Sequence, residues 1–302
     1  MDPRQRYHEL NERVFDLYLD DRHDDALRLI AEAPSELAPW RAELAYLSAC
    51  LNGASGRPEQ ALQVLEDAAA EGDWWDPSVL GGDDDLAELR SLPAYDSLLA
   101  VSVDRWRRAN AAIDRSGDVL VRPTEPARGL VVALHGAEEN ASDAVVAWSA
   151  AAYVGYAVLA VRSSQRTSPN YRTWPDEERA AYEIGEAMER LPAELSGLPV
   201  VAAGFSAGGR VALRWALTAR PSRVAGVITV APAIRPDAIP TEPIGPLAPA
   251  RLVVGADDDL LDDVSAAARV LEPAGFALDV VPGLAHGFPV DFSKRLGTWL
   301  SA

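Results

Sequence analysis

The sequence predicts a chain in two parts: an all-α helical segment, and an α/β domain whose mostly parallel sheet is covered by helices on both faces. Two observations predict this. Before residue 116, amphipathic helical patterns follow one another without a strand pattern. After it, short apolar runs alternate with helical stretches. The expected domains are therefore residues 1–115 and residues 116–302.

The first part contains an internal repeat. Residues 24–30 and 59–65 align at an offset of 35 positions, and Arg22 matches Arg57 at the same offset. This is close to the tetratricopeptide period of about 34 residues. The segment resembles a tetratricopeptide-like repeat, with an Ala-rich helical bundle as the alternative. A third, degenerate unit is expected at 83–99, and a helix around 101–113 leads into the second part.

The second part alternates strands with helices. Strands are expected at 118–122, 129–134, 156–161, 199–203, 225–230, 251–255 and 276–281, and helices at 177–191, 209–218, 263–271 and 293–300. Strands of a parallel sheet end at one edge, where open α/β sheets bind their ligands. Residues that follow these strands are therefore candidates for a functional site.

The fourth of these strands is followed at once by the sequence Gly204-Phe205-Ser206-Ala207-Gly208. A Gly-x-Ser-x-Gly pattern between a strand and a helix predicts a nucleophile elbow, which exposes the serine on a sharp turn. Glycines are needed there because side chains on either side of the serine would collide as strand and helix approach each other. Ser206 is therefore the predicted nucleophile.

The order of the remaining residues suits a serine hydrolase, in which an acid and then a histidine follow the serine. Of the four histidines, His286 alone follows Ser206, directly after the expected strand at 276–281. The acid should follow the strand at 251–255, where Asp257, Asp258 and Asp259 are adjacent. One carboxylate must accept the imidazole N–H. The other two are expected to be solvated or to cap the next helix.

Acyl transfer also requires donors to the developing oxyanion. One is expected from the backbone N–H of Ala207, the residue after the nucleophile. The second should come from the loop after the strand at 129–134, with the Ala137 N–H as first choice and Gly136 as the alternative. His135, in the same loop, is expected to be structural and to take no part in proton exchange.

Four segments together resemble an α/β-hydrolase of the carboxylesterase, phospholipase and dienelactone-hydrolase type, over about residues 117–302. They are Leu134-His135-Gly136, the elbow at 204–208, Gly255-x-x-Asp258 and Gly283-x-x-His286. The resemblance implies a serine-hydrolase fold and mechanism, and it favours Asp258, because the acid commonly lies fourth in a Gly-x-x-Asp segment. One departure is that Glu138 and Glu139 replace a glycine run, which places negative charge near the oxyanion site unless they face water.

The expected reaction is hydrolysis of a small carboxylic ester or lactone through an acyl-enzyme. Trp174 and Phe288 follow strands in the sequence and are candidates for aromatic walls of the substrate site. A peptidase or amidase with the same triad is one alternative. The second alternative belongs to another class of protein. It is a helical-repeat scaffold with an inert hydrolase domain, whose helical part could bind a partner or self-associate.

Composition narrows the remaining choices. The 302 residues carry 46 acidic and 28 basic side chains, a formal net charge of −18, which argues against binding to nucleic acid or to an anionic membrane surface. Cys50 is the sole cysteine, so no internal disulfide is expected. No metal or cofactor is expected. Charged residues interrupt the first fifteen positions, so we expect no signal peptide and a cytoplasmic location.

Overall fold

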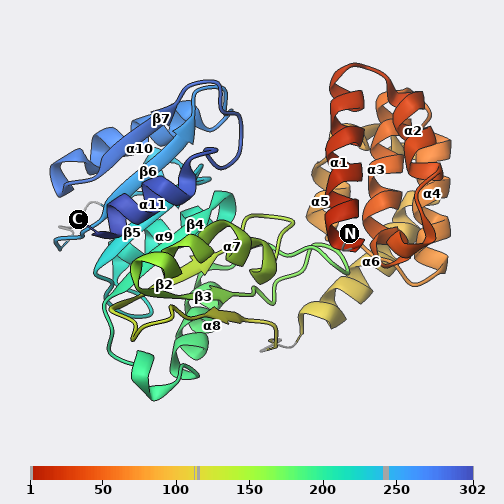
Figure 1. Cartoon of the computed structure of the whole chain (residues 1–302). Helices are drawn as coiled ribbons and strands as arrows, with labels where there is room; N and C mark the ends of the chain where they lie inside the picture. Colours follow the sequence, from red (N-terminus) through yellow and green to blue (C-terminus); the bar gives the residue numbers. More distant parts are fainter. Residues whose placement is uncertain (1–2, 112, 114–115, 241–244, 302) are drawn as a thin grey trace. The chain divides into compact units, whose positions relative to one another are not determined.

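The structure is a computed structural model that describes residues 3–111, 113, 116–240 and 245–301. The chain divides into two compact units (Figure 1). The helical unit comprises residues 1–112 together with Arg166–Tyr171, and the sheet unit comprises residues 113–165 and 172–302. The predicted boundary falls beside residues 114 and 115, which lie outside the described part of the chain.

The helical unit consists of paired helices. Its elements are α1 (Pro3–Leu19), α2 (His23–Ala31), η1 (Ser35–Trp40), α3 (Arg41–Ala54), α4 (Pro58–Ala70), α5 (Pro77–Gly82), η2 (Ala87–Ser91) and α6 (Tyr95–Asn110), where η denotes a 3₁₀ helix. Helix α1 packs on α2 and α3 packs on α4, so the first four α-helices form two successive hairpins (Figure 1).

The two hairpin turns have the same geometry at the offset of 35 positions found in the sequence. Asp21 and Gly56 both adopt the left-handed conformation, with φ of 56° and 68°. The next residues, Arg22 and Arg57, each donate a backbone hydrogen bond to the carbonyl five positions earlier, at 2.8 and 2.9 Å. The sequence repeat is therefore also a repeat of backbone conformation.

The same correspondence extends into the core of the helical unit, because Ala26 of α2 and Ala61 of α4 are both completely buried. Small side chains at these positions allow neighbouring helices to approach closely. The predicted third unit at 83–99 is different. This segment holds η2 and the first turn of α6, with extended backbone at Leu92 between them, so it does not form a hairpin of two α-helices.

The sheet unit is built on a mostly parallel sheet (Figure 1). Among the described residues seven strands form it: β1 (Val119–Val121), β2 (Gly129–Leu134), β3 (Tyr156–Val161), β4 (Val200–Phe205), β5 (Gly226–Val230), β6 (Ala250–Gly255) and β7 (Ala277–Val281). Their spatial order is β1-β3-β2-β4-β5-β6-β7, and β1 alone runs antiparallel, against β3. The carboxyl ends of the other six strands therefore share one edge.

Helices cover both faces of this sheet. Helices α8 (Glu177–Glu189), α9 (Ser206–Thr218) and α10 (Leu261–Leu271) pack on one face, and α7 (Ala141–Trp148), η3 (Ser149–Val154) and α11 (Phe292–Ser301) pack on the other. Along β2, Leu130 and Val132 face the first layer, whereas Val131 and Ala133 face the second. The strand is apolar throughout because both of its faces are buried. The predicted fold class is confirmed.

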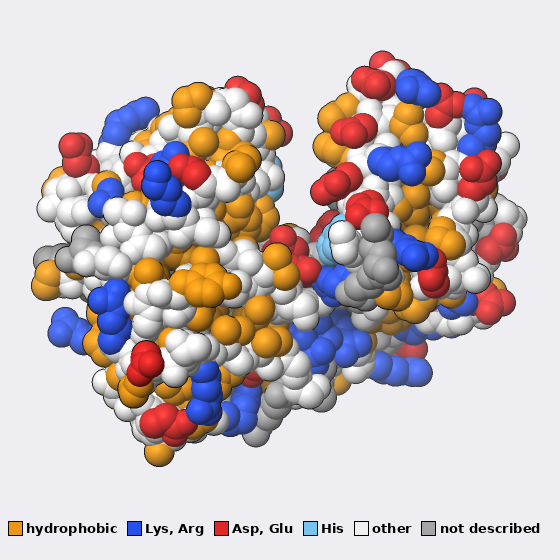
Figure 2. All heavy atoms as spheres, viewed as in Figure 1, with side chains coloured by type: hydrophobic (Ala, Val, Ile, Leu, Met, Phe, Trp, Pro, Cys, Tyr) orange, Lys and Arg blue, Asp and Glu red, His pale blue; other side chains and the backbone are white. Residues whose placement is uncertain are grey.

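Short 3₁₀ helices, η4 (Ala193–Leu195), η5 (Pro236–Ala238) and η6 (Glu272–Ala274), complete the sheet unit. On the face of each unit seen in Figure 2, acidic and basic side chains are interspersed, so the net negative charge is not gathered into one patch there. Among the described residues, no helix combines the length and the apolar character needed to cross a membrane.

Candidate active site

The nucleophile elbow lies where β4 passes into α9. Ser206 is the first residue of α9 and has φ of 49°, a strained conformation for a residue with a side chain. A Cβ at Gly204 would lie 2.3 Å from the Gly208 carbonyl oxygen, and a Cβ at Gly208 would lie 2.3 Å from the His135 carbonyl oxygen. Both of these contacts would be with backbone atoms. A side chain on either side of the serine would therefore collide, as expected from the sequence.

The loops after β6 and β7 bring a carboxylate to the imidazole of His286. Asp258 Oδ2 lies 3.0 Å from His286 Nδ1, and Oδ1 lies 3.2 Å from it. The Asp258 side chain is completely buried, whereas that of His286 is 42% exposed. Asp257 and Asp259 are exposed. Of the three candidate aspartates, Asp258 is therefore the one whose carboxylate the fold directs at the histidine.

Backbone contacts fix these two loops against each other. Asp257 N–H donates to the Leu284 carbonyl at 2.9 Å, and Leu260 N–H donates to Asp258 Oδ1 at 2.9 Å. A Cβ at Gly255 would lie 1.9 Å from the Leu284 carbonyl oxygen, so only glycine allows this close approach. One oxygen of the Asp258 carboxylate is thus bound by its own loop, and the other contacts His286.

The amides at the start of the loop after β2 differ in their hydrogen-bond partners. The Gly136 N–H donates to Glu139 Oε2 at 2.7 Å, and the Glu138 N–H donates to the Arg172 carbonyl at 2.8 Å. Within the described residues the Ala137 N–H donates no hydrogen bond, and Ala137 is exposed. The geometry therefore supports Ala137 over Gly136 as an oxyanion donor.

The two glutamates of this loop have different surroundings. Glu139 turns back onto the Gly136 amide, as described above, and Glu138 is exposed to solvent. The second expected donor, the Ala207 N–H, lies in the first turn of α9, where backbone N–H groups have no partner within the helix. The positive end of the α9 dipole also favours negative charge at this position.

His135 is buried beneath the same loop and has a structural role. Its Nε2 accepts the Ser163 N–H at 3.2 Å, so its proton resides on Nδ1, which donates to the Gly136 carbonyl at 2.7 Å. Trp174 packs on the His135 ring and donates from Nε1 to the His135 carbonyl at 2.9 Å. Trp174 was predicted to line the substrate site, yet it is completely buried and lies in the core, where it supports the loop.

One aromatic ring packs on His286, and a second packs on the first. The Phe205 ring lies 4.9 Å from the His286 ring, and Phe288 lies 4.9 Å from Phe205, measured between ring centres. Both phenylalanines are partly exposed. Phe288 was expected here, but Phe205 was not considered, although its place beside the serine in the elbow pattern could have indicated it.

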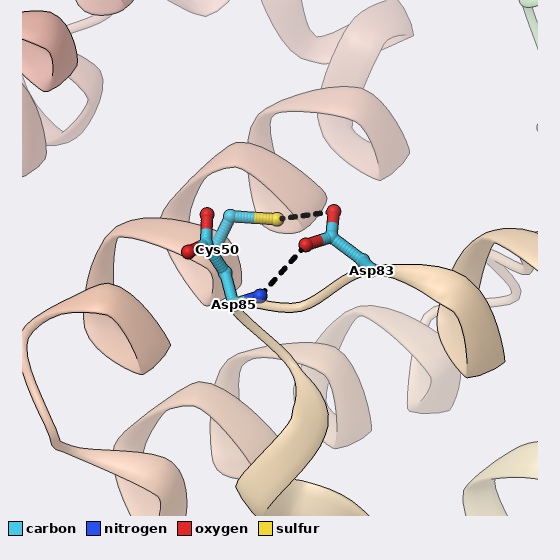
Figure 3. A group of neighbouring side chains, drawn as sticks. All are labelled: Cys50, Asp83 and Asp85. Atoms are coloured by element: carbon cyan, nitrogen blue, oxygen red, sulfur yellow. Dashed lines mark hydrogen bonds between the residues drawn. The ribbon is translucent and has the colours of Figure 1, made fainter.

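The described residues contain one group of side chains with metal-binding donor types, Cys50, Asp83 and Asp85, whose donor atoms lie within 4.8 Å of one another (Figure 3). Asp83 accepts hydrogen bonds from the Cys50 thiol at 3.5 Å, from the Asp85 N–H at 2.9 Å and from the Tyr46 hydroxyl. Burial raises the pKa of the Cys50 thiol, which opposes the thiolate that a metal requires. We therefore attribute this grouping to hydrogen bonding within the helical unit.

Comparison with known proteins agrees with this architecture. Residues 125–255 match a family model described as serine aminopeptidase, S33, and residues 6–110 match one described as an A/B hydrolase-like N-terminal domain. The chain is an α/β-hydrolase with an N-terminal helical domain. No curated protein matches this α/β-hydrolase.

Solved structures show the same fold. An uncharacterized protein from Bacillus cereus is 24% identical to this α/β-hydrolase, with a TM-score of 0.51 and coverage of 98% of this chain and 97% of that one. The structure of esterase PE8 is 19% identical, with a TM-score of 0.50, and covers 61% of this chain and 97% of its own. The first likeness extends over both units of the chain.

Proposed function

We propose that this hydrolase is a serine esterase with Ser206 as nucleophile, His286 as general base and Asp258 as the acid that orients it. The observation that carries the proposal is the Asp258–His286 contact of 3.0 Å, at the sheet edge where β4 presents Ser206 on its strained turn. The three residues follow parallel strands β4, β6 and β7, whose carboxyl ends share one edge of the sheet, which is where such folds bind their ligands.

The proposed reaction begins when His286 Nε2 takes the proton of the Ser206 hydroxyl as Oγ attacks the ester carbonyl. Asp258 holds the other proton on Nδ1 and stabilises the imidazolium that forms. The oxyanion accepts hydrogen bonds from the Ala137 and Ala207 amides. The alcohol leaves with the proton from His286, and water then repeats the sequence to release the acid.

The aromatic rings favour an acyl or aryl ester over a highly charged substrate. Phe205 is partly exposed beside His286, and Phe288 is partly exposed against Phe205; we propose that the two rings form the apolar wall of the substrate site. Binding sites for small molecules commonly combine such walls with a few placed polar groups. Trp174 is assigned no contact with substrate, because its ring is completely buried.

Two measurements test the proposal. A fluorophosphonate probe should label the protein and should fail to label Ser206→Ala. Aryl esters of graded acyl length should be hydrolysed by the wild-type protein, with Ser206→Ala as the blank. Labelling of a residue other than Ser206, or undiminished turnover by Ser206→Ala, would refute the assignment of the nucleophile.

A peptidase or amidase is the second candidate, favoured by the match of residues 125–255 to the serine aminopeptidase model. The same triad can attack a peptide bond, but an amine is a poorer leaving group and depends more on proton donation by His286. Aminoacyl p-nitroanilides should be compared with the matching p-nitrophenyl esters. A higher kcat/KM on the anilides would favour the peptidase. A protein that hydrolyses none of these substrates and is not labelled by the fluorophosphonate probe would favour an inert scaffold.

A further inference from the structure

The helical unit includes six residues, Arg166–Tyr171, from the middle of the loop between β3 and α8. Their backbone is bound by several helical elements. The Arg166 carbonyl accepts hydrogen bonds from Trp106 Nε1 at 3.0 Å and Asn110 Nδ2 at 3.1 Å, both on α6. The Thr167 carbonyl accepts from the Asp76 N–H at 2.6 Å. The loop is therefore a constituent of the helical unit, although its ends belong to the sheet unit.

The tip of this loop is bound by one buried carboxylate. Glu43, on α3, is 2% exposed. Its Oε1 accepts the Asn170 backbone N–H at 3.1 Å and the Ser168 hydroxyl, and its Oε2 accepts Asn170 Nδ2 at 3.1 Å. A buried carboxylate is tolerated only when its oxygens are paired in this way. The Asn170 Nδ2 also donates to the Pro39 carbonyl at 2.5 Å. Removing the carboxylate would therefore leave the Ser168 hydroxyl and the Asn170 backbone N–H without their acceptor, while the Asn170 side chain would keep one.

The residues that follow the tip hold the oxyanion loop. Within the sheet unit, the Arg172 carbonyl accepts the Glu138 N–H at 2.8 Å, and residues Glu139 and Arg172 form an isolated antiparallel β-bridge. Trp174 donates to the His135 carbonyl on the other side of Ala137. Ala137 thus lies between two points that residues 172–174 fix.

A single peptide bond, between Tyr171 and Arg172, joins the contacts of the loop with the helical unit to the contacts of residues 172–174 with the oxyanion loop. Tyr171 itself is held in the helical unit, where its hydroxyl lies 2.5 Å from that of Tyr7. Any shift of the tip that moves Tyr171 must therefore be absorbed by Arg172, whose carbonyl fixes the Glu138 amide. The position of the Ala137 N–H then depends on how firmly the helical unit holds the loop.

We propose that Glu43 is a positioning residue for the reaction: it anchors the loop at 166–171 and thereby places the Ala137 amide at the oxyanion. This inference rests on the proposed serine-hydrolase function and adds a role for the helical unit in it. Complete loss of an oxyanion donor costs about 10²–10³ in kcat. A donor that is displaced and not removed should cost less, on the order of 10–100-fold.

The test compares Glu43→Ala, Glu43→Gln and Glu59→Ala in the full chain. Glu59 is an exposed glutamate of α4 and serves as the matched control. We expect Glu43→Ala to lower kcat on an aryl ester by about 10–100-fold with KM changed less than about threefold, because the lost contact is felt mainly by the oxyanion. Glu43→Gln keeps the Oε1 acceptor and should recover most of kcat. Glu59→Ala should resemble the wild-type protein.

Two further readouts separate positioning from general destabilisation. Inhibition by an aryl boronic acid, whose tetrahedral adduct uses the oxyanion donors, should weaken in Glu43→Ala in parallel with the loss of kcat/KM. Hydrogen exchange of the peptide covering residues 135–140 should become faster in Glu43→Ala and not in Glu59→Ala, whether or not the protein is active. A lower Tm with unchanged kcat and unchanged exchange in that peptide would overturn the proposal. If the wild-type protein hydrolyses no ester or amide but exchange in that peptide is still faster in Glu43→Ala than in wild type, the positioning role is upheld and the proposed function is rejected.

Discussion

Replacing Asp258 with asparagine tests the candidate triad at one pair of atoms. The asparagine has the shape of the aspartate, and its carbonyl oxygen can take the place of Oδ1, which accepts the Leu260 N–H at 2.9 Å. The amide nitrogen then replaces Oδ2 and faces His286 Nδ1, 3.0 Å away. Because that nitrogen is a donor, Nδ1 must accept, and the imidazole proton moves to Nε2.

An imidazole with its proton on Nε2 cannot take the proton of Ser206. In serine proteases, the same aspartate-to-asparagine substitution produces the wrong tautomer and lowers kcat by about 10⁴. That factor corresponds to about 5 kcal/mol in the activation barrier. The Asp258 side chain is fully buried, so water cannot replace the lost acceptor, and we expect a loss of this size with little change in KM.

The assay is steady-state hydrolysis of an aryl ester, with Tm measured to show that each variant is folded. Asp257→Asn and Asp259→Asn are the matched controls, because both residues are exposed neighbours on the same loop. They should retain kcat within about threefold, as expected for solvated surface charges. If either control lost more activity than Asp258→Asn, the assignment of the acid would be wrong.

Three further predictions concern stability and reactivity. Gly208→Ala places a Cβ 2.3 Å from the His135 carbonyl oxygen and should cost about 1–3 kcal/mol or more in urea unfolding, whereas Gly81→Ala, with open space around its Cβ, should cost nothing measurable. Burial raises the pKa of Asp85, so the folded state favours the protonated carboxyl. The resulting contribution to folding stability is present at low pH and is lost as pH rises through the raised pKa. Asp85→Asn should therefore raise Tm at pH 7 relative to wild type and leave it unchanged at pH 3. Burial also raises the pKa of the Cys50 thiol, so iodoacetamide should alkylate it slowly in the native protein and rapidly in urea; rapid alkylation without urea would contradict this.

The strands of the sheet could be predicted closely from the sequence. The structure gives β2 and β3 the bounds expected for 129–134 and 156–161, and the other strands differ by one or two residues at an end. Strands buried on both faces are short apolar runs, and this signal is local. The elbow was equally local, because the glycines that it requires lie within two residues of Ser206.

The surroundings of the site could not be predicted in the same way. Trp174 occupies a loop after a strand, a position equally compatible with a pocket wall and with the core, and only its contact with His135 decides between them. Asp258 was preferred to its neighbours from the resemblance, because three adjacent carboxylates carry no sequence signal of which one turns inward. The membership of residues 166–171 in the helical unit depends on contacts across more than a hundred positions.

The interleaving of the two units also bears on how the protein is made. Asn170 follows Glu43 by 127 positions, which a ribosome needs roughly 6–25 s to add at typical rates of synthesis. During that interval the helices around Glu43 have emerged, but the donors that pair its carboxylate do not yet exist. Burying the unpaired carboxylate would cost several kcal/mol, so the final docking of α3 must wait. The N-terminal unit is thus the first to be synthesised, but it cannot be completed until β3 and the loop after it have left the ribosome.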